Sequence, residues 1–391
     1  MIVSVIALCT LVSVITTVQS DPTQAATDRS PATTSGPNPS STDNELRGVS
    51  ALSATDVWAV GRYFDQRTRI YETLTVHWDG RRWSRVRSPS PSVTANALNG
   101  VSARTATDVW AVGNTQSRNL TFRWDGAAWE TVHAPSYSWN DQALYAVSAR
   151  SAGDAWAVGY EVSNDTGFDE TLTLHWHGTI WNRVKSPNGD PFTNYLYGVS
   201  AYSADDAWAV GAVGVGSNQV RTLILHWDRT SWLPVHSPDP SSMDNRLAGV
   251  SAASTTDAWA VGSYRSDATH EYVPMTLHWD GTVWSRVNGP NDVSTDDYLS
   301  GVSALSATDA WAVGQSFDPL TGEYDTLILH WDGTSWSQVE SPNPSSTLNE
   351  LNGVSALSAT DAWAVGRYLD DATGVYKTLM LHWDGTSWSQ T

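Results

Sequence analysis

From Asn44 to the end, the chain alternates short runs of strand-forming residues with short runs of turn residues. In the final unit the four runs are 351–356, 361–366, 378–383 and 388–391. The Asp-Gly pair between the last two runs predicts a tight hairpin, because Gly tolerates positive φ. No unit has the 3.6-residue apolar spacing of an amphipathic helix. The pattern therefore predicts an all-β chain of antiparallel strands.

This unit occurs seven times. The tetrapeptide Gly-Val-Ser-Ala, once Ala-Val-Ser-Ala, recurs at spacings of 52, 46, 52, 51, 52 and 52 residues. Its first residues are Gly48, Gly100, Ala146, Gly198, Gly249, Gly301 and Gly353. A period of this length with four strands per unit is typical of propellers. We therefore predict a seven-bladed β-propeller over residues 44–391, four antiparallel strands per blade, with repeats starting near residues 46, 98, 144, 196, 247, 299 and 351.

Tryptophan and the repeated polar residues fit the same unit. Of the 22 Trp, 21 occupy three fixed places per repeat, in the second run, at the end of the third and at the start of the fourth. We expect them to fill the wedge between neighbouring sheets, with sugar-stacking platforms as the alternative. An Asp before each second run is expected to accept backbone N–H bonds in a turn. The third-run His residues, replaced once by Arg123, lie on separate blades and are expected to pack, so we predict no metal and no cofactor.

The N-terminal segments differ from the repeats. Residues 1–20 are apolar and uncharged and end in Val18-Gln19-Ser20, which predicts a signal peptide cleaved after Ser20. The missing basic residues leave a retained anchor as the alternative. Residues 21–43 are rich in Pro, Ser and Thr and are expected to form a flexible stalk. We therefore expect an extracellular or surface-anchored protein.

The composition limits the classes of partner that the protein can bind. The chain has 41 acidic and 22 basic residues and a net charge of −19, which excludes nucleic acid and argues against membrane insertion of the propeller. The single Cys9 lies in the predicted signal peptide, so stability is expected to come from packing without disulfides. We expect a monomer that binds an extracellular glycan or protein.

The unit L-x-G-V-S-A…D-A-W-A-V-G…L-H-W-D-G-T-S-W resembles the repeats of Trp-rich bacterial exported propellers over about residues 44–391. It is more distantly similar to Asp-box and kelch-type propellers, such as sialidases and photosystem assembly factors, mainly through the hairpin Asp79-Gly80…Trp83. That hairpin departs from the Asp-box pattern in its Asp-to-Trp interval, in the His before it and in His177 of the third repeat. The resemblance implies a rigid exported scaffold and carries over no sialidase activity.

The variable segments indicate where function would lie. The loops between second and third strands and the crossovers between repeats emerge on one face, here called the loop face, and they vary while the other turns repeat. Two residues before each first-strand Leu stands an amide or carboxylate, expected to ring the channel mouth or, alternatively, to support the turn. These residues are Asn44, Asn96, Gln142, Asn194, Asn245, Asp297 and Asn349.

Trp139 is the one Trp outside the repeat pattern. It lies in the second crossover beside Tyr137 and near Gln142 and Tyr145, a cluster suited to stacking on sugars or anchoring a protein. Neutral drift of a surface loop is a third interpretation. We predict an exported, non-catalytic binding or scaffold propeller. The alternative is a carbohydrate-active, glycosidase-like enzyme that uses loop carboxylates, although no catalytic motif is present. Examples of such carboxylates are Asp370-Asp371, Asp325 and Asp296-Asp297.

Overall fold

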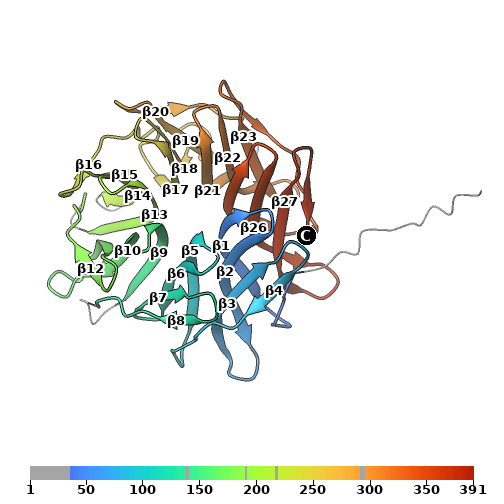
Figure 1. Ribbon diagram of the computed structural model, residues 1–391. Coiled ribbons are helices and arrows are strands. Elements are labelled where there is room, and N and C mark those ends of the chain that lie inside the picture. Colours follow the sequence, from blue (N-terminus) through green and yellow to red (C-terminus); the bar gives the residue numbers. More distant parts are fainter. Residues whose placement is uncertain (1–35, 137–140, 190–191, 216–218, 291–295) are drawn as a thin grey trace, which may run out of the picture. The chain divides into compact units, whose positions relative to one another are not determined.

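The computed structural model describes residues 36–136, 141–189, 192–215, 219–290 and 296–391 of the chain. Residues Thr34–Thr391 form one compact unit. Its described part holds 28 strands, and no helix there is long and apolar enough to cross a membrane. The strands form sheets that radiate from a common centre (Figure 1). We number the repeats in chain order, so that β1–β4 belong to repeat 1 and β25–β28 to repeat 7.

Each repeat supplies four strands. The first strands are β1 (Asn44–Ser53), β5 (Asn96–Thr105), β9 (Gln142–Ser151), β13 (Thr193–Ser203), β17 (Asn245–Ser254), β21 (Asp296–Ser306) and β25 (Asn349–Ser358). The second strands are β2 (Asp56–Asp65), β6 (Asp108–Thr115), β10 (Asp154–Val162), β14 (Asp206–Val215), β18 (Asp257–Arg265), β22 (Asp309–Asp318) and β26 (Asp361–Asp370). The third strands are β3 (Ile70–Trp78), β7 (Asn119–Trp124), β11 (Asp169–Trp176), β15 (Gln219–Trp227), β19 (Tyr272–Trp279), β23 (Glu323–Trp331) and β27 (Val375–Trp383). The fourth strands are β4 (Trp83–Val86), β8 (Trp129–Thr131), β12 (Trp181–Val184), β16 (Trp232–Pro234), β20 (Trp284–Val287), β24 (Trp336–Gln338) and β28 (Trp388–Gln390).

Consecutive strands of a repeat pair antiparallel, which confirms the predicted all-β repeat of four strands. The described strands form six sheets, of which five have four strands and one has eight. The eight-stranded sheet contains repeats 3 and 4, joined by one parallel pair between Asp169 and Thr193. The same bridge, from a third strand to the following crossover, lies outside the named strands elsewhere, at Asp43–Tyr376, Tyr71–Ala95, Val220–Asp244 and Tyr324–Leu348.

Residues of the Gly-Val-Ser-Ala segment form hydrogen bonds between each first strand and the first strand of the next repeat. The backbone N–H of Ala103 in β5 donates to the Ser50 hydroxyl of β1 over 2.9 Å, and an equivalent bond links every following pair of first strands. The series continues from repeat 7 to repeat 1, where Ala51 N–H donates to Ser355 Oγ over 3.0 Å. The first strands therefore form a closed ring of hydrogen-bonded neighbours.

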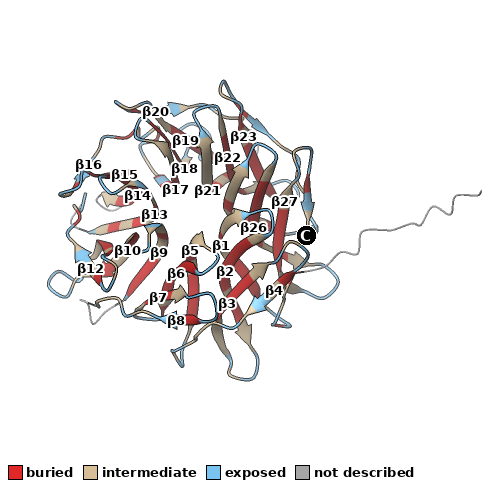
Figure 2. Cartoon of the chain, viewed as in Figure 1, coloured by how far each residue is buried: buried red, intermediate tan, exposed pale blue. Residues whose placement is uncertain are grey.

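Tryptophan fills the space between sheets, as the repeat pattern predicts. Trp58 of repeat 1 lies 5.0 Å from Trp124 and 5.3 Å from Trp129 of repeat 2, measured between ring centroids. Trp363 of repeat 7 makes the same contacts with Trp78 and Trp83 of repeat 1, at 5.3 and 5.6 Å. The buried core accordingly lies between the sheets, along their middle strands (Figure 2).

The repeated Asp residues have a different partner from the one expected. The Asp56 carboxylate lies 2.8 Å from His77 Nε2, and the His ring packs on Trp58 at 4.4 Å. The sequence predicted that a backbone N–H of the turn would donate to the Asp56 carboxylate. In the structure the Thr55 N–H of this turn donates to Ser53 Oγ instead. In repeat 2 Arg123 substitutes for His and donates to Asp108. The prediction of packed, hydrogen-bonded third-strand His residues is confirmed.

Each first strand contains a β-bulge directly after its leucine. In β9, Leu144 pairs with Gly159 and Ala146 with Val158, so Tyr145 has no partner residue. The equivalent bulge residues are Arg47, Asn99, Tyr197, Ala248, Ser300 and Asn352. A Cβ atom on Gly159 would lie 1.8 Å from the carbonyl oxygen of Ala143. The bulge therefore requires glycine on the facing second strand.

Residues 36–43, which the sequence assigned to the stalk, lie against repeat 7. Their sequence, GPNPSSTD, nearly repeats the crossover SPNPSSTL at 341–348. Asn38 accepts hydrogen bonds from the Thr378 N–H at 2.7 Å and the Thr378 hydroxyl at 3.2 Å. Asn343 accepts the same pair from Thr326. The N-terminal segment thus serves repeat 7 as a crossover, in addition to the sheet packing expected to close the ring.

We predict that Asn38→Ala lowers the free energy of unfolding by about 1–2 kcal/mol, because two donors of Thr378 lose their acceptor. Asn343→Ala is the matched control within the chain and is expected to cost the same amount. Denaturant unfolding measures both. An Asn38→Ala protein as stable as the parent, beside a destabilised Asn343→Ala protein, would show that residues 36–43 do not act as a crossover.

We predict that Gly159→Ala lowers the free energy of unfolding by about 1–3 kcal/mol, because the added methyl overlaps the backbone of β9. Gly153→Ala is the control, since its nearest atom outside the turn would be 3.7 Å from the new Cβ. Thermal unfolding of both variants tests the requirement. Equal melting temperatures would contradict it.

Candidate functional site

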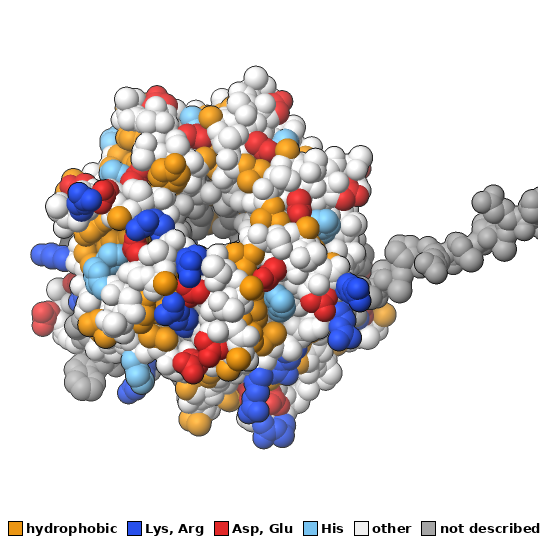
Figure 3. Space-filling view, viewed as in Figure 1, with side chains coloured by type: hydrophobic (Ala, Val, Ile, Leu, Met, Phe, Trp, Pro, Cys, Tyr) orange, Lys and Arg blue, Asp and Glu red, His pale blue; other side chains and the backbone are white. Residues whose placement is uncertain are grey.

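A small cavity of about 170 Å³ lies at the centre of the ring, where Figure 3 shows a hollow. Its wall takes residues from the first strand of every repeat, mostly Gly and Val of the Gly-Val-Ser-Ala segment. These residues are nearly constant along the chain. The varied part of the wall comes from the bulge residues Asn99, Tyr145, Tyr197, Ala248 and Ser300. A bulge redirects a side chain out of the regular alternation of a strand, so this position can vary without disturbing the sheet.

Four tyrosines of repeats 3 and 4 form an aromatic cluster, and two of them, Tyr145 and Tyr197, line this wall. Tyr145 lies 6.0 Å from Tyr160 in a stacked arrangement and 5.2 Å from Tyr197. Tyr195 lies 4.8 Å from Tyr160, edge to face, and stacks with Tyr197 at 5.8 Å. All four are half-buried and come from three strands, β9, β10 and β13. We call these four residues the tyrosine cluster.

The hydroxyl groups of the cluster are protonated donors. Burial raises the pKa of Tyr145, and the neighbouring Tyr160 and Tyr197 raise it further. Burial also raises the pKa of Tyr195, whose hydroxyl donates to the Asp169 carboxylate at the start of β11. The cluster therefore presents ring faces and neutral hydroxyls near neutral pH, with the carboxylate of Asp169 at its edge.

A network of charges lies across repeats 7 and 1. Glu45 pairs with Arg47 at 3.0 Å and with Arg62 at 2.8 Å, and Arg47 also donates to Asn99 over 2.7 Å. Burial raises the pKa of Glu45, but Arg47, Arg62 and the more distant Arg367 outweigh burial, so the pKa lies below its usual range. The ring therefore has an aromatic part and an ionic part.

The predicted ring of amides and carboxylates lies inside the protein. All seven members are at most 4% exposed. Asn44 accepts from the Ser40 N–H at 2.8 Å and donates to the carbonyls of Ser40 and Tyr376 at 2.9 Å. Three equivalent bonds recur at Asn96, Asn245 and Asn349. In these four repeats the side chain supports the turn, and all seven members are too buried to face a ligand, so the candidate site does not include them.

Of the described members of the predicted cluster around Trp139, Tyr145 lines the cavity. Tyr137 and Trp139 lie outside the described residues. Gln142 is buried and bonds to Asn119 and Ser136 over 2.9 and 2.6 Å. Sequence reasoning missed Tyr160, Tyr195 and Tyr197. The sequence does mark the bulge residue. It is the variable residue between the constant Leu and the Gly, once Ala, of each first strand.

Asp370 and Asp371, two of the loop carboxylates considered for catalysis, have protein partners. Asp370 pairs with Lys377 at 2.6 Å, and Asp371 accepts from Ser345 and Ser346. Burial, followed by the charges of Glu323 and Asp318, raises the pKa of Asp325. Across the described ranges, no group of three or more His, Cys, Asp or Glu could hold a metal ion.

Comparisons with known proteins bear on the fold. No family model and no curated protein matches the chain. Among solved structures, YCF48 bound to D1 peptide has a TM-score of 0.53 at 13% identity, over 88% of this chain and 94% of that one. YCF48 from Cyanidioschyzon merolae has a TM-score of 0.54 at 15% identity, over 88% and 97%. U3-55K has a TM-score of 0.51 at 9% identity, over 82% and 88%. These proteins are β-propellers, and the chain has the β-propeller fold.

Proposed function

We propose that this protein is an exported, non-catalytic propeller of seven blades that binds a protein partner at the tyrosine cluster. The blade count is supported by the repeats themselves, since each supplies one first strand to the central cavity. The eight-stranded sheet then counts as two blades, because a single parallel pair joins repeats 3 and 4. Repeat 7 meets repeat 1 through the same serine and tryptophan contacts as every other pair.

The observation that carries the binding function is the tyrosine cluster. Tyrosine is enriched in the centres of protein interfaces because it combines a large apolar ring with a polar hydroxyl and few rotatable bonds. Here the rings are fixed by mutual packing, so little side-chain freedom remains to be lost on binding. The neutral hydroxyls of Tyr145 and Tyr197 can donate hydrogen bonds to peptide carbonyls.

A protein partner is preferred over a glycan for two reasons. The similar propeller YCF48 has been solved with a D1 peptide, which is a precedent for peptide binding on this fold. The ionic part of the ring, centred on Glu45 and Arg47, also offers charges of both signs, which suit the mixed side chains of a peptide. Sugars stack on aromatic rings as well, so glycans belong in the test.

We predict that Tyr145→Ala and Tyr197→Ala each weaken binding by about 2 kcal/mol, as expected for interface hot spots. Peptides selected from a displayed library on the parent protein serve as probes, and their affinities are measured by titration. Tyr202→Ala is the control, because Tyr202 is 47% exposed near the opposite end of β13. Selected peptides that bind all three variants like the parent would overturn the site.

The same proteins distinguish the other ligand classes. A glycan array in which only sugars depend on Tyr145 would replace the protein partner with a carbohydrate. Release of reducing sugar from a polysaccharide, lost on substitution of one loop carboxylate such as Asp325, would favour the glycosidase-like alternative. Neither outcome is expected.

We predict that export removes residues 1–20. A signal peptide with small residues before the cut leaves a mature chain that starts at Asp21. N-terminal sequencing of the protein secreted by a bacterial host measures this directly. Full-length protein retained in the membrane fraction would support the anchor instead.

A further inference from the structure

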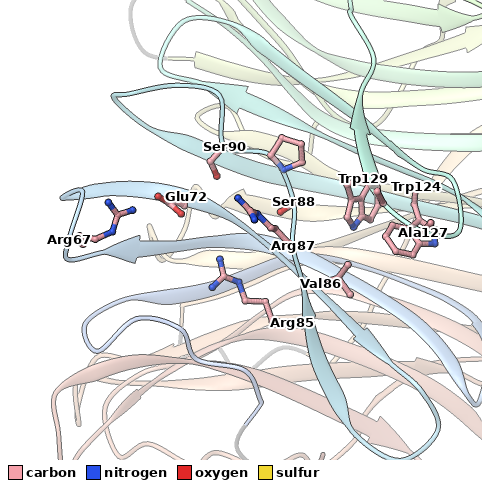
Figure 4. A pocket seen from close by; sticks show the side chains of 12 residues that line it. Arg67, Glu72, Arg85, Val86, Arg87, Ser88, Ser90, Trp124, Ala127 and Trp129 are labelled. Atoms are coloured by element: carbon pink, nitrogen blue, oxygen red, sulfur yellow. The ribbon is translucent and has the colours of Figure 1, made fainter.

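A second cavity lies between the outer strands of repeats 1 and 2, and it shares no lining residue with the tyrosine cluster. Its volume is about 590 Å³. One wall is β4 with the residues that follow it, and the other is the end of β7, the turn and the start of β8, including Trp124 and Trp129. We call it the outer groove. Figure 4 shows Arg67, Arg85 and Arg87 toward one end and the two Trp rings at the other.

The groove lies in the most basic stretch of an acidic protein. Seven of the 22 basic residues fall between Arg62 and Arg87, against three acidic residues there. Figure 3 shows Lys and Arg side chains gathered where Figure 1 draws the outer part of repeat 1. An anionic ligand would meet a local excess of positive charge here, whereas the rest of the chain has 38 acidic (41 − 3) and 15 basic (22 − 7) residues.

The three groove arginines are available to a ligand to different degrees. Arg87 is exposed, and no ion pair involves it in the part of the chain that the structure describes. Arg67 keeps a side chain that is 81% exposed beside Asp65. Arg85 is held by the Tyr63 hydroxyl at 2.6 Å and by the Tyr63 ring at 4.4 Å, so its position is fixed. The one carboxylate in the wall, Glu72, already accepts from Tyr63 at 2.6 Å.

The backbone of β4 favours a peptide as the occupant. β4 pairs with β3 on one side and is the last strand of its sheet. The N–H and C=O groups on its other side can pair with an added strand, as in other cases of β-strand addition. A sulfated or uronic-acid glycan would use the arginines but not this edge.

The equivalent groove between repeats 3 and 4 has a single basic side chain in its lining. It has a volume of about 430 Å³ and holds Lys185 at the position of Arg87. The counterpart of Arg85 is Arg183, whose guanidinium is paired with Glu161. A groove therefore occurs at the equivalent place in both pairs of repeats, but only the groove of repeat 1 is lined by a cluster of available cations.

We propose that the outer groove of repeat 1 binds an extended acidic segment of a partner protein. The segment adds to the edge of β4 and pairs its carboxylates with Arg67, Arg85 and Arg87. Alternate residues of an added strand face the same side, so carboxylates at every second position fit best. Arginine binds carboxylate with two parallel hydrogen bonds, which favours an acidic peptide over a merely polar one.

The test uses the full chain and a fluorescent peptide with Glu at every second position, with a Gln version as the neutral probe. At about 50 mM salt we expect the Glu peptide to bind at least tenfold more tightly than the Gln peptide, and to lose affinity as salt screens the charges. We expect Arg87→Glu and Arg67→Glu each to weaken binding about tenfold. Both residues are exposed, and circular dichroism verifies their folding.

Lys185→Glu is the matched control and is expected to bind the Glu peptide like the parent. Tyr145→Ala should also bind it like the parent, which keeps this groove separate from the tyrosine cluster. Equal affinity for the Glu and Gln peptides, or equal loss in Arg87→Glu and Lys185→Glu, would overturn the proposal. Arg87-dependent binding of heparin oligosaccharides without binding of the Glu peptide would also overturn it.

Discussion

The structure depends on one contact, the indole of each second strand inserted against the sheet of the next repeat. Trp58, for example, is almost fully buried by groups that belong mainly to repeat 2. A single repeat has no means of covering this ring by itself. Since burial of apolar surface is the main favourable term in folding, the sheets gain stability only as neighbours. The hydrogen bonds between first strands, such as the one from the Ala103 N–H to Ser50 Oγ, then fix the distance between neighbouring sheets at the centre of the propeller. The packed indole rings set the same distance farther out.

Positions that are the same in every repeat could be interpreted from the sequence. The Trp triplet predicted the sheets, because its pattern in each repeat could be checked against six others. The Asp-Gly hairpin, present in five of the seven repeats, supported the same prediction. The partner of Asp56 could not be predicted. A short carboxylate before a strand normally caps its own turn, and only the pairing of β2 with β3 brings His77 within reach.

The candidate site was predicted in part. Tyr145 was identified, but its neighbours Tyr160, Tyr195 and Tyr197 were not, since they meet across three strands whose register the sequence does not display. The bulge is likewise a property of pairing and not of one strand. The amide at Asn44 was predicted with two alternatives, and its bonds to Ser40 and Tyr376 match the one in which it supports the turn. The constant scaffold residues and the variable bulge residue thus occupy adjacent positions of one strand.

The N-terminal crossover gives the fold an unusual symmetry. Residues 36–43 lie against Thr378 as residues 341–348 lie against Thr326, so repeat 7 is contacted by a crossover that is not joined to its own fourth strand. Every junction of the ring could then accommodate the break. Circular permutants opened at another crossover should assemble the same ring. The folded ring would then be the same whichever repeat comes first in the chain.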